Sequence, residues 1–193
     1  MDSRKRKRKA YIAKKYDLVN DKDELVCVGT KQDAKKLKLF TRSVHIWLIN
    51  KQGKIMICRR SANMKSYANQ ITSSAGGHVE QRESYKNAAM RELKEELGFR
   101  SSLKDLGKFK VVSSKERAMH HLFFGKANKK IFADPNEISA YSFLSFTELS
   151  RDIALHPRRY CKPFHKAFNF YSTVTLLAKL RGLSISQPRR SAT

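Results

Sequence analysis

The sequence predicts a protein of the α/β (α+β) class, built as an α/β/α sandwich around a mixed sheet. Short β-rich segments stand on both sides of one amphipathic helix near the middle of the chain, and two further helical segments close it. The chain has 193 residues, of which 40% are hydrophobic, which suffices for one domain with a real core. Strands that bracket a helix and are followed by helices favour a sheet between helical layers.

Strands and loops are expected before the central helix. Residues 16–30 form two short strands around a polar turn at 20–23, and residues 33–40 are a basic connector. A hairpin follows, in which "SVHIWLIN" and "IMICRR" flank a turn that contains Gly53. Residues 61–70 are then a polar loop, and "ITSSAGGHV" is a short strand that breaks at Gly76-Gly77.

The central helix is expected over residues 84–97, and Gly98 stands where a C-terminal cap belongs. Its apolar face is defined by residues at three- and four-residue spacing, namely Ala88, Ala89, Leu93 and Leu97.

Three more strands and two helices are expected after it: strands over 108–114, 118–127 and 138–146, then helices over 147–153 and 163–180. Adjacent residues of a strand point to opposite faces, so only one of His120 and His121 can face a cleft, and we expect buried, hydrogen-bonded imidazoles. The helical spacing of three aromatic residues predicts a core position for them, with base stacking as the alternative: Phe164, Phe168 and Tyr171.

The domain organisation follows from composition. We expect a basic disordered arm over residues 1–14, one domain over 15–181, and a flexible basic tail over 182–193. No apolar run is long enough to span a bilayer, and three scattered cysteines without C-x-x-C spacing predict reduced thiols. We therefore expect a cytoplasmic protein, with residues 4–9 as a nuclear-import signal in a eukaryotic host; the oligomeric state stays open.

The charge of the chain is extreme. Lys and Arg number 41 against 17 Asp and Glu, which gives a formal net charge of +24. Such a surface predicts attraction to polyanions: nucleic acid, acidic membranes or phosphorylated small molecules. Against this background, five acidic residues lie close together between Glu80 and Glu96.

Three of these acids, Glu92, Glu95 and Glu96, share one face of the central helix. Like charges at three- and four-residue spacing destabilise a helix by a few tenths of a kcal/mol per pair. Either neighbouring Lys and Arg residues compensate them or a divalent cation binds between them. Because the ligands are oxygens only, the cation would be Mg²⁺ or Mn²⁺ rather than zinc.

The acids belong to a longer pattern. Gly77 is followed after five residues by Glu83, and then after seven by "RELKEELGF" from Arg91 to Phe99. This resembles the Nudix box, G-x5-E-x7-R-E-U-x-E-E-x-G-U with U apolar, and every specified position is filled. The resemblance implies a Nudix-like fold and hydrolysis of a nucleoside diphosphate linked to some other moiety, X.

The resemblance also implies a role for each residue of the box. Glu92, Glu95 and Glu96 would ligate Mg²⁺ or Mn²⁺, together with the Gly77 carbonyl, and Glu92 and Glu96 would take part in catalysis. Arg91 and Glu83, opposite in charge, would pair and orient the loop before the helix. The catalytic base can lie outside the box, where Glu137 and Glu116 are the two candidates.

Outside the box, residues 16–171 resemble the branch that contains type I isopentenyl-diphosphate isomerases and their hydrolase relatives. Arg60 would hold a diphosphate, with Lys65 nearby. The isomerases carry Cys-Gly-His where this chain has Gly76-Gly77-His78, and their two histidines before the hairpin fall at Ala34 and Thr41. Without that thiol an isomerase is not expected.

Three functions are therefore weighed. The leading one is a Mg²⁺-dependent hydrolase of a small phosphorylated substrate. The second acts instead on the 5′ end of RNA, capped or triphosphorylated, because the basic surface would attract a polyanion. The third is a non-enzymatic, RNA-binding Nudix protein, against which the complete acidic triad argues.

Overall fold

The computed structural model describes residues 13–114 and 116–181. The tail predicted for 182–193 and all but residues 13 and 14 of the predicted arm lie outside the described residues. Lys14, which the sequence placed in the arm, contacts the body, since its ammonium lies 2.6 Å from the Glu80 carboxylate. None of the described helices combines the length and hydropathy of a transmembrane span.

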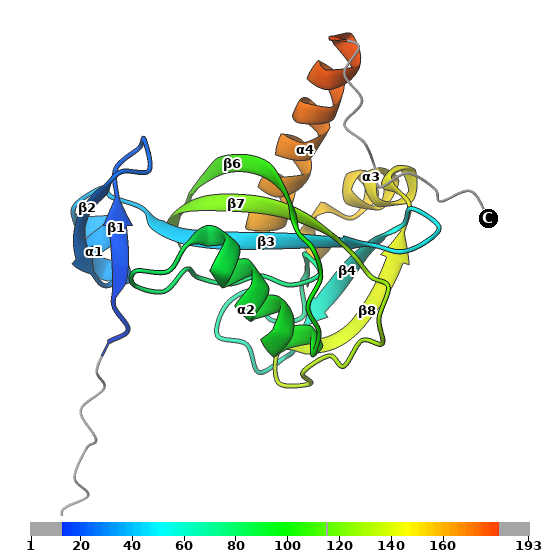
Figure 1. Cartoon of the computed structure of the whole chain (residues 1–193), viewed down its shortest axis with the longest axis horizontal. Helices are drawn as coiled ribbons and strands as arrows, with labels where there is room; N and C mark the ends of the chain where they lie inside the picture. The colour runs from blue at the N-terminus through cyan, green and yellow to red at the C-terminus, as the bar shows by residue number, and fades with distance from the viewer. Residues whose placement is uncertain (1–12, 115, 182–193) are drawn as a thin grey trace, which may run out of the picture.

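A six-stranded mixed sheet forms the middle layer (Figure 1). Its order is β5-β4-β3-β7-β6, and β8 also pairs with β4. The β3 and β7 strands run parallel, and the other ladders are antiparallel. The strands are β3 (Thr41–Ile49), β4 (Ile55–Arg60), β5 (Ile71–Thr72), β6 (Lys104–Val112), β7 (Arg117–Lys126) and β8 (Ile138–Leu144).

Helices cover both faces of this sheet (Figure 1). The α2 helix (Tyr85–Leu97) packs on one face, and α3 (Phe146–Leu155) and α4 (Lys162–Leu180) pack on the other, with the short 3₁₀ helix η1 (Pro157–Arg159) between them. Alternation along β3 separates the two cores: Ile46 belongs to the α2 side, and Trp47 belongs to the α4 side with Phe164. The predicted α/β/α sandwich is confirmed.

The central helix begins and ends as predicted. The Ser84 hydroxyl accepts a hydrogen bond from the Asn87 N–H (3.2 Å), which caps the first turn. Gly98 ends the helix in the left-handed conformation with φ 76°. The aromatic rings of α4 are also in the core as expected: Phe164, Phe168 and Tyr171.

The connector predicted for residues 33–40 is instead partly helical. The α1 helix (Lys31–Lys36) begins at a capping box in which the Asp33 N–H donates to the Thr30 hydroxyl (3.2 Å) and the Thr30 N–H donates to the Asp33 carboxylate (2.8 Å). With β1 (Tyr16–Val19) and β2 (Leu25–Gly29), α1 forms a small N-terminal unit beside the sheet (Figure 1).

The predicted hairpin is present but open. The register of β3 and β4 contains one pair, Ile49 with Ile55, and β4 then pairs with β5 and β8. Residues 73–78 pair with β3 where β4 would otherwise do so. The Ile46 N–H donates to the Ala75 carbonyl (2.9 Å), and the Val44 N–H donates to the Gly77 carbonyl (2.8 Å). This glycine loop holds the two strands apart.

Asp23 joins the N-terminal unit to the sheet. Its carboxylate accepts hydrogen bonds from Arg42 Nε of β3 (2.7 Å), from the Tyr85 hydroxyl of α2 (3.0 Å) and from the Lys108 ammonium of β6. The side chain is only 6% exposed. Burial alone would raise the pKa of Asp23, but the hydrogen bonds from Lys108 and Arg42 lower it below its ordinary value.

We expect Asp23→Asn to reduce the free energy of unfolding by roughly 1.5–3 kcal/mol at pH 7, because it removes charge-assisted bonds and leaves Arg42 without its anion. The lowered pKa stabilises the fold above the unfolded-state pKa of about 3.9, and this contribution is lost as pH falls through the folded value. Urea unfolding should therefore show the difference from the wild type shrinking as pH falls below about 4. Asp21→Asn, whose carboxylate is 72% exposed, is the matched control, with a change below about 0.5 kcal/mol.

Candidate active site

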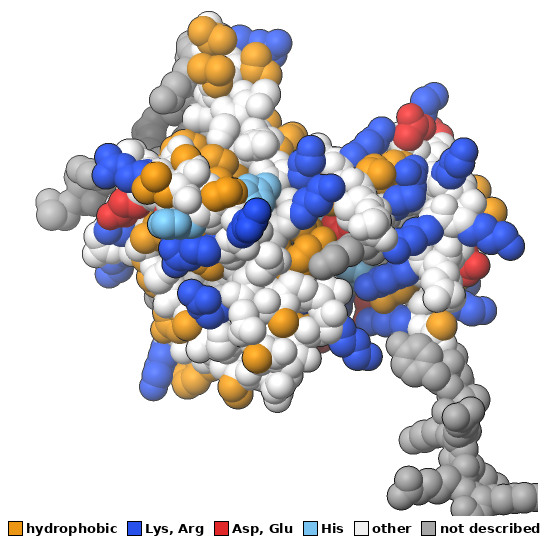
Figure 2. All heavy atoms as spheres, turned by 180° about the vertical axis from the view of Figure 1, so that it is seen from behind, with side chains coloured by type: hydrophobic (Ala, Val, Ile, Leu, Met, Phe, Trp, Pro, Cys, Tyr) orange, Lys and Arg blue, Asp and Glu red, His pale blue; other side chains and the backbone are white. Residues whose placement is uncertain are grey.

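A cleft of about 640 Å³ opens where the glycine loop separates β3 from β4. It is lined by the β3 strand, by the loops 60–67 and 72–78, by two glutamates of α2, and by the beginnings of β7 and α4. Such a volume is usual for a site that binds a small molecule. From behind the molecule, Lys and Arg side chains are seen to gather over the N-terminal unit that borders this cleft (Figure 2).

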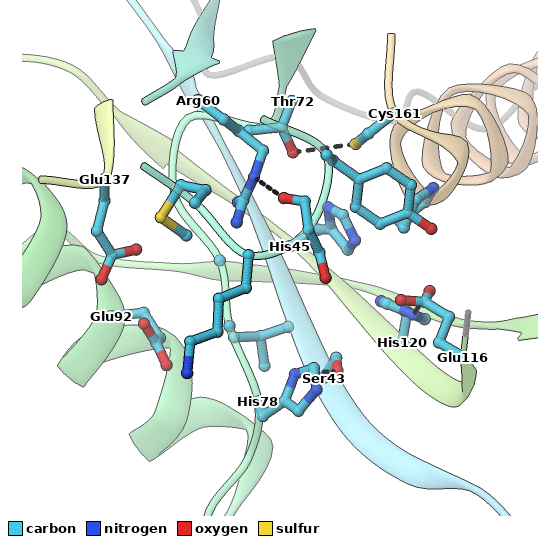
Figure 3. A pocket seen from close by; sticks show the side chains of 18 of the residues that line it. Ser43, His45, Arg60, Thr72, His78, Glu92, Glu116, His120, Glu137 and Cys161 are labelled. Carbon is cyan, nitrogen blue, oxygen red and sulfur yellow. Dashed lines mark hydrogen bonds and ion pairs between the residues drawn. The ribbon is translucent and has the colours of Figure 1, made fainter. Parts of the chain in front are cut away.

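Carboxylates occupy one end of the cleft. Glu92 and Glu96 reach it from α2. Glu137, just before β8, points toward Glu92 at the same end (Figure 3). Glu96 is buried and accepts a hydrogen bond from the Gly76 N–H (2.9 Å). Burial raises the pKa of Glu96 well above its ordinary value, and burial also raises that of Glu92, with further increases from the charge of Glu137.

Arg91 organises the box residues. Its guanidinium donates to both oxygens of Glu83 (3.0 and 2.9 Å), as the sequence led us to expect, and also to Glu92 (2.8 Å) and Glu95 (3.1 Å). A further hydrogen bond reaches the His78 carbonyl (3.1 Å) and so connects the helix to the glycine loop. These carboxylates raise the pKa of Arg91.

Glu95 lies apart from the other two box glutamates. Its side chain is 58% exposed, contacts Arg91, and is not among the residues that line the cleft. Of the three acids that share the helix face, Glu92 and Glu96 therefore line the cleft with Glu137, and Glu95 does not.

The two glycines leave room for other groups. A Cβ at Gly77 would lie 2.2 Å from Glu92 Oε1, so the carboxylate occupies the space of the missing side chain. The Gly77 carbonyl accepts the hydrogen bond from Val44 and is thus directed at β3. A Cβ at Gly76 would lie 2.5 Å from the Val44 carbonyl oxygen, so this backbone leaves no room for the cysteine of the isomerases.

Arg60 and Lys65 also line the cleft, so the two cations expected to bind phosphate lie in the same cavity as the carboxylates. Arg60 Nε donates to the Ser66 carbonyl (3.1 Å), which anchors this side chain to the 61–67 loop (Figure 3). Glu116, the other base candidate, lines the cleft as well, but its carboxylate lies 3.2 Å from His120 Nε2.

The floor of the cleft was not predicted from the sequence. His45 Nδ1 lies 2.6 Å from the Ser73 hydroxyl, and His78 Nδ1 lies 3.1 Å from the Ser43 hydroxyl. Burial lowers the pKa of His78 to about 3 and lowers that of His45 well below its usual value. The signal available was that serine and histidine alternate with apolar residues at the start of β3.

The paired histidines behave as expected. His120 and His121 are both buried, and His121 Nε2 lies 2.5 Å from the Asp105 carboxylate. His120 lines the cleft, whereas His121 packs against Tyr85 on the opposite face of the sheet. The cysteines are free, as predicted; Cys161 is buried and lines the cleft beside Thr72.

The donor chemistry of the acidic end fits a hard divalent cation. Its ligands would be carboxylate oxygens alone, which suit Mg²⁺ or Mn²⁺, and the space beside Gly77 already holds one of these groups. In residues 13–114 and 116–181, however, no three acidic, histidine or cysteine side chains already converge as a metal site, and Glu92 is turned to Arg91. Binding a cation would require Glu92 to share or exchange this partner.

Comparisons with known proteins agree with this geometry. The family model of the NUDIX domain matches residues 39–163. A Nudix hydrolase of Deinococcus radiodurans is 29% identical over 72% of this chain and 84% of its own length. Isopentenyl-diphosphate Delta-isomerase 2 of Aromatoleum aromaticum is 26% identical over 74% of this chain and 78% of its own length.

Solved structures show the same fold. The crystal structure of DR0079 from Deinococcus radiodurans superposes with a TM-score of 0.64 at 29% identity, covering 74% of this chain and 90% of that one. The dihydroneopterin triphosphate pyrophosphohydrolase of E. coli superposes with a TM-score of 0.51 at 19% identity, over 71% and 98% of the two chains. Since the family model spans more than half of the sequence, the chain belongs to the NUDIX domain family, as a pyrophosphohydrolase of the branch related to isopentenyl-diphosphate isomerases.

Proposed function

We propose that this Nudix enzyme hydrolyses the diphosphate of a nucleoside diphosphate linked to X, with Mg²⁺ or Mn²⁺ as its cofactor. The observation that carries the proposal is the meeting of Glu92, Glu96 and Glu137 with Arg60 and Lys65 in one small-molecule cleft. Carboxylates can hold a cation and accept a proton, while the two basic side chains can hold phosphate oxygens. Both lower the barrier to hydrolysis of a phosphoric anhydride.

The proposed division of labour follows the contacts. Glu92 and Glu96 would hold the cation, which neutralises charge on the diphosphate when bound. Glu95 could join them only by leaving Arg91, and a ligand role for the Gly77 carbonyl rests on the resemblance alone. Arg91 and Glu83 would act by position, since they hold the helix to the glycine loop.

In the proposed reaction, a water molecule attacks one phosphorus atom, a carboxylate takes its proton, and the P–O bond to the departing phosphate breaks. Glu137 is our candidate for the base, because it faces Glu92 without a bond to Arg91 (Figure 3). Glu116 is the weaker candidate, because its carboxylate is engaged by His120.

Isomerisation is disfavoured by the same geometry. The position of the isomerase thiol is Gly76, whose missing side chain faces the Val44 carbonyl. Cys161 does line the cleft, but burial raises the pKa of its thiol, which is hydrogen-bonded to Thr72. This chain therefore resembles the relatives named as isomerases in sequence, but it has a glycine where the resemblance places their cysteine.

We expect Glu96→Gln to lower kcat by about 10²–10⁴-fold, because it removes a charge from the proposed metal site. The glutamine oxygen can still accept the hydrogen bond from Gly76, so the melting temperature should be unchanged or higher. Phosphate release from a panel of nucleoside diphosphate derivatives measures the effect. Glu95→Gln, outside the cleft, is the control and should lose much less activity; equal losses would mean that the cleft does not define the site.

Metal removal should abolish turnover. With EDTA, hydrolysis of every substrate in the panel should stop, and added Mg²⁺ or Mn²⁺ should restore it, since only a hard cation suits this oxygen-rich end. Full activity in EDTA would refute the proposed cofactor. Capped RNA belongs in the same panel, because preferential cleavage of it would favour the RNA 5′ end as the substrate instead.

Gly77→Ala should reduce kcat by at least about tenfold, because the added methyl group would overlap the Glu92 carboxylate. Shortening that side chain should relieve the overlap, so Gly77→Ala combined with Glu92→Asp should be no worse than Glu92→Asp alone. Steady-state kinetics of the three variants provide the check. Unchanged activity in Gly77→Ala would show that the position of Glu92 beside this glycine is not the active one.

A further inference from the structure

The cleft has a second end, which is cationic. Lys31 and Lys35 of α1 and Arg117 at the start of β7 line the same cavity as the carboxylates of α2. Glu116 is the one carboxylate that lines this end among the described residues, and it is bonded to His120. Three cations therefore outnumber one engaged carboxylate, whereas the other end holds three carboxylates.

The two ends are separated along β3. Arg117 precedes Ala118, which pairs with Thr41 at the first residue of the strand. The glycine loop is hydrogen-bonded to β3 at Val44, nearer the middle of the strand, where the Val44 N–H donates to the Gly77 carbonyl. Val44 is three residues beyond Thr41, so these two points of β3 are about 10 Å apart at about 3.3 Å per residue. That distance is comparable with the length of one nucleoside unit.

The cations are held in place by groups other than acids. Lys35 Nζ donates to the Ser114 carbonyl (2.8 Å), and Arg117 donates to the carbonyls of Leu39 (3.2 Å) and Lys38 (2.8 Å). The Lys31 ammonium lies over the Tyr16 ring, 5.6 Å from its centroid. Contacts with carbonyls and a ring position these side chains without neutralising their charge, which leaves it for a ligand.

Two of these cations lie outside the part of the chain that the NUDIX model matches. The NUDIX match begins at residue 39, so Lys31 and Lys35 come from the N-terminal unit that precedes it. The Asp23 network fixes this unit on β3, α2 and β6. The unit thus brings positive charge to a cavity that also holds the carboxylates, Arg60 and Lys65, which points to a part of the substrate that is not hydrolysed.

We propose that the substrate carries a second phosphate group, a monoester about one nucleoside unit away from the diphosphate that is cleaved, and that Lys31 and Lys35 bind it with Arg117. This inference rests on the proposed function and names the substrate class of the same site. A small molecule is favoured over an RNA strand, because the two ends share one cavity of about 640 Å³.

Matched substrate pairs test the proposal. Coenzyme A differs from dephospho-coenzyme A, and NADPH from NADH, by one phosphate monoester on the nucleoside. We expect the wild-type kcat/KM to be at least about tenfold higher for the phosphorylated member of a pair, as one or two charge-assisted contacts would give. The double variant Lys31→Met, Lys35→Met should bring this ratio close to one.

Lys36→Met is the control, since Lys36 is on the same helix and exposed but does not line the cleft. It should keep the wild-type ratio. In a separate binding assay with Mg²⁺, adenosine 3′,5′-bisphosphate should bind the wild type at least about tenfold more tightly than AMP does, and the double variant should lose this difference.

The outcomes are distinguishable. If both members of each pair are cleaved equally fast, or if the lysine variants leave the ratio unchanged, the second phosphate site is refuted and the proposed hydrolase stands. If neither member is cleaved, and no other diphosphate in the panel is either, the proposed function fails together with the inference. A strong preference for capped RNA over all small substrates would assign the cationic end to a nucleic acid strand instead.

Discussion

The site depends on one guanidinium. Arg91 contacts three carboxylates and one carbonyl, and through the His78 carbonyl it attaches α2 to the glycine loop. The protein itself therefore supplies one cation, Arg91, to the cluster of acids that stands out in this basic sequence. Glu96 is held differently, by the Gly76 N–H, and is the more deeply buried carboxylate. A metal ion would enter a site in which Arg91 has already limited where the glutamates can go.

The cleft exists because β3 and β4 part after a single pair. The glycine loop takes the hydrogen bonds of β3 that a tight hairpin would have used, and both glycines are placed where a side chain would overlap a neighbour. The same backbone that brings Glu92 and Glu96 together also excludes a cysteine at residue 76. The absence of a thiol at residue 76 and the tight packing of the glycine loop therefore have the same cause, which is the close approach of this backbone to β3.

Local signals in the sequence predicted the layers, the central helix with its caps and the box residues, and the pairing of Arg91 with Glu83 is confirmed. Most of what they missed depends on contacts distant in sequence. The parting of β4 from β3 requires β8 and the loop 73–78, and neither reveals its partner by periodicity. Ser43 and His45 become the floor only once the hairpin is open. The α1 helix was missed although Thr30 and Asp33 form a capping box, because its six residues show no apolar period.

The surplus of positive charge has a partial explanation in this geometry. A uniformly basic surface would steer any anion toward the molecule, but it would not orient one. Inside the cleft, three carboxylates lie toward the glycine loop, whereas Lys31 and Lys35 of the N-terminal unit and Arg117 of β7 lie toward the start of β3. A substrate with phosphate at only one point would leave one of these ends without a function. A substrate with phosphate groups at both ends would be aligned along β3. Its monoester, held by the cations, would place the anhydride at the carboxylates.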